Sequence, residues 1–158
     1  MRHILKLHRD LNTQSLPQTA HDYTIENFDI AVYKQQWLDL NNRIFAHHPD
    51  QGNWVMADLD NRISEPWFDS AGFFLATESG VIQGFVWTKI HQDLVNQDPV
   101  GELYVVGTAP EHHGKGIARA LSVQAINYFV SKDLKHAMLY VDADNEKGLK
   151  LYQSLGFN

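Results

Sequence analysis

The residues best suited to chemistry follow a strand-like apolar run in the second half of the chain. The segment Gly101–Ala118 reads GELYVVGTAPEHHGKGIA: the run is followed by a glycine-rich turn and then by an apolar pattern that predicts a helix. Amide N–H groups in the first turn of a helix have no internal partner, and the helix dipole is positive there. Gly114 and Gly116 have no Cβ, so a ligand can approach their backbone closely. The segment therefore predicts an anion site, best suited to phosphate.

Two common phosphate-binding patterns do not fit this turn. A P-loop has four residues between its first Gly and the Gly-Lys pair, whereas six separate Gly107 from Gly114 here. The dinucleotide pattern G-x-G-x-x-G also fails, because Arg119 stands where its third Gly belongs. A glycine-rich turn without a ligand therefore stays open as an alternative when the segment is considered alone.

The nine His residues and the absence of cysteine bear on metal chemistry. A disulfide scaffold, a thiolate zinc site and a Cys nucleophile are excluded because the chain has no cysteine. The pairs His47-His48 and His112-His113 are adjacent in sequence, so their side chains point apart, and the nearby carboxylates are not spaced for ligation. His91 stands alone in sequence. We expect these residues to be surface or loop His, and we expect no metal site.

Hydrophobic periodicity and turn residues predict a mixed α/β fold. Because a strand, a helix and another strand follow one another in the second half, a parallel crossover is expected there. Helices are expected at 31–46, 56–64, from Gly116 onward and at 145–155; strands are expected near 4–7 and at 23–28, 72–77, 81–91, 102–108 and 136–143.

Length and composition limit the possible classes of protein. The chain has 158 residues, which suits one domain, and 44% apolar residues can form a core. The expected organisation is an N-terminal extended segment and linker at 1–22, followed by one domain at 23–158. A net charge of −6 without a basic run argues against nucleic acid as a partner, and no apolar stretch is long enough for a membrane helix. A cytoplasmic protein is expected.

Two motifs resemble the signatures of the GCN5-related N-acetyltransferase (GNAT) family. HGKGIA, at His113–Ala118, is similar to the family's pyrophosphate loop, although His113 stands where Arg or Gln is usual. The segment LYVDADNEKGLKLYQSLGF, at 139–157, resembles the second signature: a strand, an Asn near a helix start, and a helix that ends in Tyr-x-x-Leu-Gly-Phe. The resemblance implies the acyl-CoA N-acyltransferase fold, a central mixed β-sheet flanked by helices.

The resemblance also implies acetyl-CoA as co-substrate and a primary amine as acceptor. In the family the central strand splays from its neighbour, and the CoA arm lies in the gap. Residues expected to bind CoA are Val106, Gly107, Thr108, His113, Gly114, Lys115, Gly116, Ile117, Ala118, Arg119, Asn145 and Lys150.

Two residues are candidates for proton transfer. Tyr152 occupies the family's usual position for the acid that protonates the leaving thiolate, and the alternative is a tyrosine packed on the core. Glu102 begins the central strand and, by alternation, shares a face with Tyr104 and Val106. Because a carboxylate is costly to bury in an apolar strand without a purpose, Glu102 is the candidate base, acting through water. The alternative is an exposed Glu at the end of a strand.

Further stretches resemble one subgroup of this family, the mycothiol synthases, in their C-terminal catalytic domain. They include EPWFD at 65–69 and GFVWTKIH at 84–91, which a shared CoA site does not explain. The subgroup acetylates the cysteinyl amine of Cys-glucosamine-inositol. Its substrate-contacting positions fall here on Asp50, Lys89, Glu102 and Tyr140. Lys89 and Tyr140 can donate hydrogen bonds to hydroxyls, and the two carboxylates can accept them.

Three alternatives for function remain at this stage. The acceptor is Cys-glucosamine-inositol, or another amine such as a small metabolite or a protein N-terminus, or the chain is a non-catalytic acetyl-CoA-binding domain. The family fold normally continues into a closing strand beyond the position of Phe157 and Asn158. We therefore expect that strand to be absent and a sheet edge to be open, where a second GNAT domain or another copy of the chain could pair.

Overall fold

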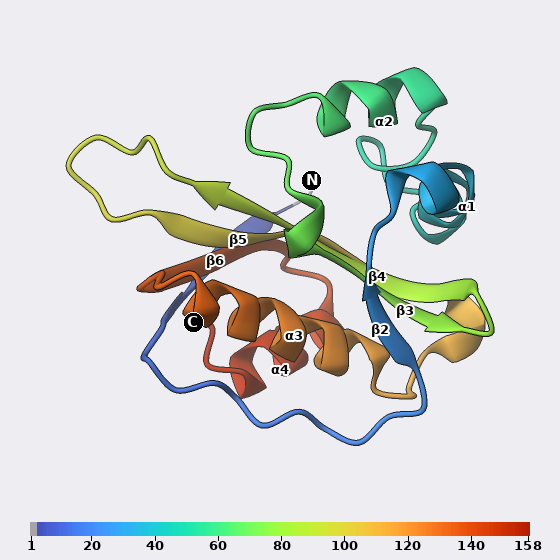
Figure 1. Cartoon of the computed structure of the whole chain (residues 1–158). Coiled ribbons are helices and arrows are strands. Elements are labelled where there is room, and N and C mark those ends of the chain that lie inside the picture. The colour runs from blue at the N-terminus through green and yellow to red at the C-terminus, as the bar shows by residue number, and fades with distance from the viewer. Residues whose placement is uncertain (1–2) are drawn as a thin grey trace.

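A mixed sheet with helices on both faces forms the architecture in the computed structural model, which describes residues 3–158 (Figure 1). The strands are β1 Ile4–Asp10, β2 Thr24–Asn27, β3 Phe73–Glu78, β4 Val81–His91, β5 Val100–Thr108 and β6 His136–Asp142. The helices are α1 Ile30–Ile44, α2 Met56–Ile63, α3 Ile117–Ser131 and α4 Glu146–Ser154, with short 3-10 turns at Ser70–Gly72 and Pro110–His112. The predicted mixed α/β class is confirmed, and most element boundaries lie within one or two residues of those predicted.

Local sequence explains where three of the helices begin. Asp29 caps α1 by accepting a hydrogen bond from the amide of Ala31 at 2.9 Å, and Asn145 caps α4 by accepting one from Gly148 at 2.9 Å. Gly116 precedes α3 in the left-handed conformation, with a φ of 80°. Only glycine adopts that conformation at little cost. The start of α3 is therefore fixed by a backbone requirement and carries no capping side chain.

The two faces of the sheet carry different cores. On the side of α1 and α2, the core is rich in aromatic side chains, and Trp37 lies with its ring 5.2 Å from that of Phe85 and 5.4 Å from that of Trp87. On the side of α3, mainly aliphatic side chains pack, among them Leu121 and Ile126. Figure 1 shows α1 and α2 on one side of the sheet and α3 and α4 on the other.

Strand order and direction place two parallel strands near the middle of the sheet. The order is β1-β6-β5-β4-β3-β2. β5 and β6 run parallel, joined by the crossover through α3, and the other neighbours run antiparallel. The predicted parallel crossover is therefore confirmed.

The N-terminal strand changes what the sequence suggested about the edge of the sheet. β1 pairs antiparallel with β6 over its whole length, and Leu7 is buried in the aliphatic core. The segment near residues 4–7, expected to precede the domain, is thus a strand of its sheet. β1 occupies the position beside β6, so the outer strands of the sheet are β1 and β2. The sequence could not show this pairing, since the partners lie about 130 residues apart.

No helix within residues 3–158 has the length and apolar character needed to cross a membrane.

Candidate active site

The parallel pair β5–β6 separates halfway along its length. The two strands are paired from Val100 with His136 to Leu103 with Leu139, and the pairing stops there although both strands continue. The gap contains a cavity of about 270 Å³. It is lined by Ile4, Phe45, His48, Gln51, Leu103, Tyr104, Val105, Val106, Leu139, Tyr140, Val141, Asp142, Asn145 and Tyr152. The splayed central strand that the sequence resemblance implied is therefore present.

A bulge in β5 turns the backbone where the splay begins. Trp87 of β4 is paired with Val105 and the next residue, Thr88, with Leu103, so Tyr104 is an extra residue. Beyond the bulge the side chains change faces: Val105 joins the aromatic core with Tyr104, and Val106 packs against the aliphatic core. The prediction that Glu102, Tyr104 and Val106 share one face is therefore wrong for Val106, because simple alternation does not allow for a bulge.

The turn before α3 presents a row of backbone donors. Gly114 and Gly116 both have left-handed conformations, with φ of 79° and 80°. Within residues 3–158, none of the six consecutive amides of 114–119 has a hydrogen-bond acceptor. Three of them belong to the first turn of α3, where the helix dipole is positive. The turn therefore has the donor geometry of an anion site, as the sequence predicted.

A second cavity, of about 560 Å³, lies between this turn, β5 and α4. It is lined by Ile44, Val106, Gly107, Thr108, His112, His113, Gly114, Gly116, Ile117, Ala118, Arg119, Asn145, Lys147, Gly148, Leu151 and Tyr152. Most residues predicted to bind CoA therefore surround one space. Lys115 and Lys150 do not line it; both are exposed. Lys147 and Gly148, which sequence analysis did not select, line it instead, because they share a helix face with Leu151 and Tyr152.

Three predicted cofactor-binding side chains already make contacts within the protein. The Oδ1 atom of Asn145 accepts the Gly148 amide as the cap of α4. A ring nitrogen of His113 lies 3.2 Å from the carbonyl oxygen of Thr108, which holds the turn against the end of β5. Arg119 donates a hydrogen bond to the Ser154 hydroxyl at 2.6 Å. These contacts shape the cavity walls and fix α3 relative to α4.

Tyr152 lies where the two cavities meet, since it lines both. Its hydroxyl makes no hydrogen bond within residues 3–158. Burial raises the pKa of Tyr152 from 10.0 to about 12, so the phenol is fully protonated at neutral pH. A protonated hydroxyl without an internal partner is free to donate to a group in the cavity.

Glu102 is buried, and it has a partner that the sequence analysis missed. It is 7% exposed, and its Oε1 atom lies 2.8 Å from Nε2 of His91. His91 is the last residue of β4, and its side chain reaches across to the adjacent strand. The sequence could not select this pair, because a His at the end of a strand has no distinctive pattern. The contact with the imidazole holds the buried carboxylate in one position.

Lys89 lies beside Glu102 in an aromatic environment. It is paired with Glu102 in the β4–β5 register. Its Nζ atom lies 4.7 Å from the ring centre of Trp67 and 5.9 Å from that of Tyr104. The Tyr104 hydroxyl also accepts a hydrogen bond from Nε of Arg62 at 3.2 Å. Cation–π contacts hold the ammonium group over the rings and leave its donors available to a ligand.

The two remaining predicted substrate residues lie on the side of the splay. Tyr140 lines the 270 Å³ cavity and is 56% exposed. Asp50 is exposed in the loop between α1 and α2, between the two lining residues His48 and Gln51, and its carbonyl accepts a hydrogen bond from Nε1 of Trp54 at 3.2 Å. Asp50 itself does not line a described cavity.

Comparison with known proteins defines the class to which this fold and site belong. The model of the acetyltransferase (GNAT) family matches residues 19–157. The chain therefore belongs to the GNAT family of acetyltransferases. The family resemblance seen in the sequence is confirmed.

The individual relatives that the chain resembles have a narrower name than the family. The chain is 43% identical over 158 residues to mycothiol acetyltransferase of Thermobispora bispora, covering 99% of this chain and 54% of that protein. It is 52% identical over 122 residues to mycothiol acetyltransferase of Renibacterium salmoninarum, covering 77% of this chain and 36% of that protein. The chain thus spans about half the length, or less, of the curated relatives it matches.

Solved structures support the fold. A GCN5-related N-acetyltransferase from Sphaerobacter thermophilus superimposes with a TM-score of 0.76 at 21% identity, over 99% of this chain and 48% of that one. The aminoglycoside N-acetyltransferase AAC(6')-Iy, solved in complex with CoA, superimposes with a TM-score of 0.69 at 23% identity, over 90% and 92% of the two chains.

Proposed function

We propose that this chain transfers the acetyl group of acetyl-CoA to the cysteinyl amine of Cys-glucosamine-inositol. The observation that carries the choice of acceptor is the 43% identity, over 99% of the chain, to a mycothiol acetyltransferase. The site supports acetyl-CoA as the donor. The amide turn suits a pyrophosphate, and the cavity beside this turn shares lining residues with the cavity in the splay. The proposal joins these two independent observations.

The co-substrate has a matched place on the backbone. Its pyrophosphate binds the six free amides of 114–119, and its pantetheine arm runs along the unpaired edge of β5, where Tyr104–Thr108 have lost β6 as a partner. Amide groups in such an edge can bind the arm as a neighbouring strand would. The side chains of Val106, Thr108 and Leu151 form the walls.

The chemistry needs one proton removed and one supplied. The neutral amine attacks the thioester carbon, a C–N bond forms and the C–S bond breaks. Glu102 receives the amine proton through water, and the hydrogen bond to His91 holds the carboxylate in place for that transfer. Tyr152 protonates the departing thiolate, since its raised pKa keeps the phenol protonated. Unpaired amides of β5 stabilise the oxyanion that forms on the thioester oxygen.

Polar side chains at the splay and beside Glu102 suit a hydroxyl-rich acceptor. Lys89 and Tyr140 donate hydrogen bonds to sugar or inositol hydroxyls, and Asp50 accepts them. Asp50 has a short side chain and is exposed in the loop between α1 and α2, so it reaches its hydroxyl through a bridging water. The rings of Trp67 and Tyr104 hold the Lys89 ammonium group in position.

A competition assay tests the acceptor. Cys-glucosamine-inositol, free cysteine and a peptide with a free N-terminus are offered together at equal concentration with acetyl-CoA, and the acetylated products are quantified by mass spectrometry. We expect Cys-glucosamine-inositol to be acetylated first. A preference for the peptide or for cysteine would overturn the choice of acceptor and leave acetyl transfer intact. Binding of acetyl-CoA without any product would instead identify a non-catalytic domain.

The His91→Gln variant tests the role of His91 as a positioning residue. Glutamine can still hydrogen-bond to Glu102 but cannot titrate. We expect turnover to fall about tenfold and the pH profile of kcat/KM to change shape, with the KM for acetyl-CoA unchanged. If His91 only supports the strand end, the pH profile will keep its shape. The matched control is His47→Gln, an exposed His in the loop after α1.

A further inference from the structure

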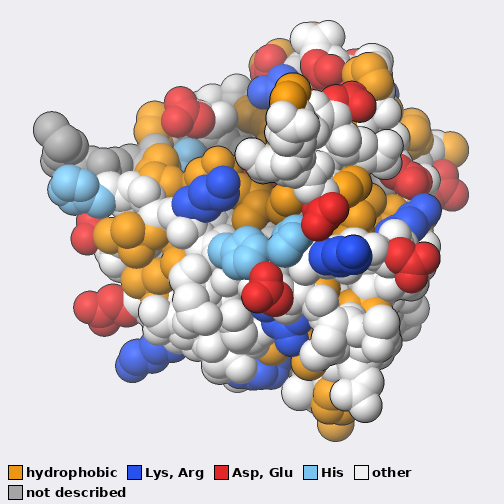
Figure 2. Space-filling view, turned by 90° about the vertical axis from the view of Figure 1, so that its left-hand side faces the viewer, with side chains coloured by type: hydrophobic (Ala, Val, Ile, Leu, Met, Phe, Trp, Pro, Cys, Tyr) orange, Lys and Arg blue, Asp and Glu red, His pale blue; other side chains and the backbone are white. Residues whose placement is uncertain are grey.

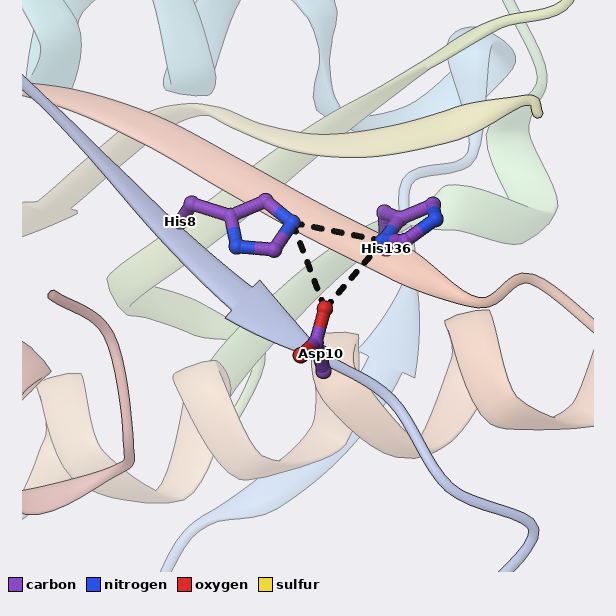
Figure 3. A group of neighbouring side chains, drawn as sticks. All are labelled: His8, Asp10 and His136. Atoms are coloured by element: carbon purple, nitrogen blue, oxygen red, sulfur yellow. Dashed lines mark hydrogen bonds and ion pairs between the residues drawn. The ribbon is translucent and has the colours of Figure 1, made fainter. Parts of the chain in front are cut away.

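A cluster of metal-ligating side chains lies at the end of the sheet where β1 and β6 are paired. His8 and Asp10 are two residues apart on β1 and therefore point to the same face. His136 is the first residue of β6 and is paired directly with Asp10. Regular strand geometry thus brings three side chains together from positions about 130 residues apart in the chain (Figure 3).

The three donor atoms converge on one point. Nε2 of His8 lies 3.3 Å from Nδ1 of His136 and 3.6 Å from Oδ1 of Asp10, and Nδ1 of His136 lies 3.3 Å from the same oxygen. Two ligands that each lie 2.0–2.1 Å from a tetrahedral zinc ion are about 3.3 Å apart. The three atoms therefore form nearly one triangular face of a zinc coordination tetrahedron.

A fourth side chain supplies an independent observation. Oδ2 of Asp98, in the loop between β4 and β5, lies 3.5 Å from Nε2 of His136. Metal-bound His usually places its other ring nitrogen against a carboxylate, which fixes the proton on that nitrogen and directs the lone pair of the first to the metal. Asp98 stands in that position relative to His136. The cluster therefore has three candidate metal ligands and a carboxylate that can orient one of them.

The cluster is open to solvent. Each of the three facing atoms has a lone pair that can bind a metal ion. Figure 2, which shows this end of the molecule, has His side chains gathered at the surface with acidic side chains near them. The His8 and Asp10 side chains are 50% and 82% exposed, so an ion has access from solvent and keeps an open position for water.

We infer that His8, Asp10 and His136 bind one Zn²⁺ ion, with Asp98 orienting His136, and that the ion fastens β1 to β6. Two imidazoles and one carboxylate are a ligand set that zinc accepts, with water in the fourth position. The site is at the opposite end of the β5–β6 pair from the amide turn, and the inference does not depend on acetyl transfer. Sequence analysis expected no metal because it considered only His residues that are near one another in the chain.

Titration calorimetry with ZnCl₂ tests the site on the tag-free chain, at a pH above about 6.5, the ordinary His pKa. We expect one ion per wild-type chain. His8→Gln and His136→Gln should each weaken binding by about 100-fold, and Asp98→Asn by about tenfold, because outer partners contribute about 10–100-fold to metal affinity. The control His47→Gln should bind as the wild type does.

Two further measurements keep the test independent of how the variants fold. Co²⁺ bound to the wild-type chain should show the intense visible absorption of a tetrahedral site, and Zn²⁺ should abolish it. Zn²⁺ should also raise the Tm of the wild type in a concentration-dependent way, by mass action. The inference is overturned if the wild type binds zinc no more tightly than His136→Gln, or if bound Co²⁺ shows only weak octahedral absorption.

Discussion

The two ends of the β5–β6 pair differ in where their chemistry comes from. At the paired end, Val100–Leu103 are bonded to β6 on one side and to β4 on the other. The backbone is satisfied there, and the reactive groups are side chains: the Glu102–His91 pair and the cluster of His8, Asp10 and His136. At the splayed end, Tyr104–Thr108 lack β6 as a partner, and the free amides of 114–119 follow.

The difference shows how one pair of strands can provide two kinds of site. A buried backbone group without a partner is costly, so a strand that loses its neighbour needs another acceptor or donor. The pantetheine arm of the proposed co-substrate has amides of its own that could supply them in the splay. Where the pairing is intact, only side chains remain to bind a ligand. Binding of an extended arm should therefore depend on the backbone at the splayed end, whereas proton transfer should depend on the side chains of Glu102 and Tyr152.

The largest effect is expected from Glu102→Gln at the paired end. This change keeps the shape of the side chain but removes the carboxylate proposed to accept the amine proton, so turnover should fall about 10³-fold. Affinity for acetyl-CoA should stay the same, because the proposed cofactor site lies at the other end. Steady-state kinetics and calorimetry measure the two quantities. Glu78→Gln, an exposed residue at the end of β3, serves as the control. If Glu102→Gln also lost affinity for acetyl-CoA, the two ends of the β5–β6 pair would not have separate roles.

Tyr152→Phe should have the next largest effect. It deletes only the hydroxyl proposed to protonate the thiolate, and turnover should fall about 10²-fold with little change in acetyl-CoA affinity. The pKa of about 12 gives this prediction a pH signature. Because the phenol stays protonated as the pH rises through 10.0, the ratio of wild-type to variant kcat/KM should stay constant there. Unchanged turnover, with chemistry shown to be rate-limiting, would make Tyr152 a packing residue only.

Gly116→Asp examines the backbone of the splayed end. The new carboxylate lies beside the amide turn and repels pyrophosphate, so we expect the Kd for acetyl-CoA to rise at least tenfold. Gly80→Asp is a matched control: both glycines have a left-handed φ, 80° and 77°, and a Cβ meets nothing within 4 Å at either position. The two variants carry the same strain and the same charge. Equal affinities in calorimetry would show that the turn does not bind the pyrophosphate.

The smallest effect is expected from Lys89→Met. The variant keeps an unbranched side chain of similar length and removes the ammonium group that lies over the ring of Trp67. A hydrogen bond made equally to substrate and transition state contributes to binding alone, so the KM for the amine should rise about fivefold with kcat unchanged. A fall in kcat of similar size would place Lys89 in the chemical step.

The sequence by itself predicted the elements and the anion turn because their causes are local. Apolar residues at helical spacing define α3, and Gly114 and Gly116 are needed wherever φ is positive. Asn145 and Gly156 mark the ends of α4 in the same way, since capping depends on residues only a few positions away. The resemblance to the GNAT family then added Tyr152 and Glu102 as candidates for proton transfer.

The tertiary structure alone decided how distant segments meet. The bulge at Tyr104 appears only in the pairing of β5 with β4, and it reversed the predicted face of Val106. The contacts of His91 with Glu102 and of His8 with His136 depend on strand register in the same way. Register is set by the pairing of whole strands and by the burial of their faces, and a shift of one residue would move every side chain to the other face. Residue spacing along one strand carries no information about its partner, so these sites could be found only in the folded chain.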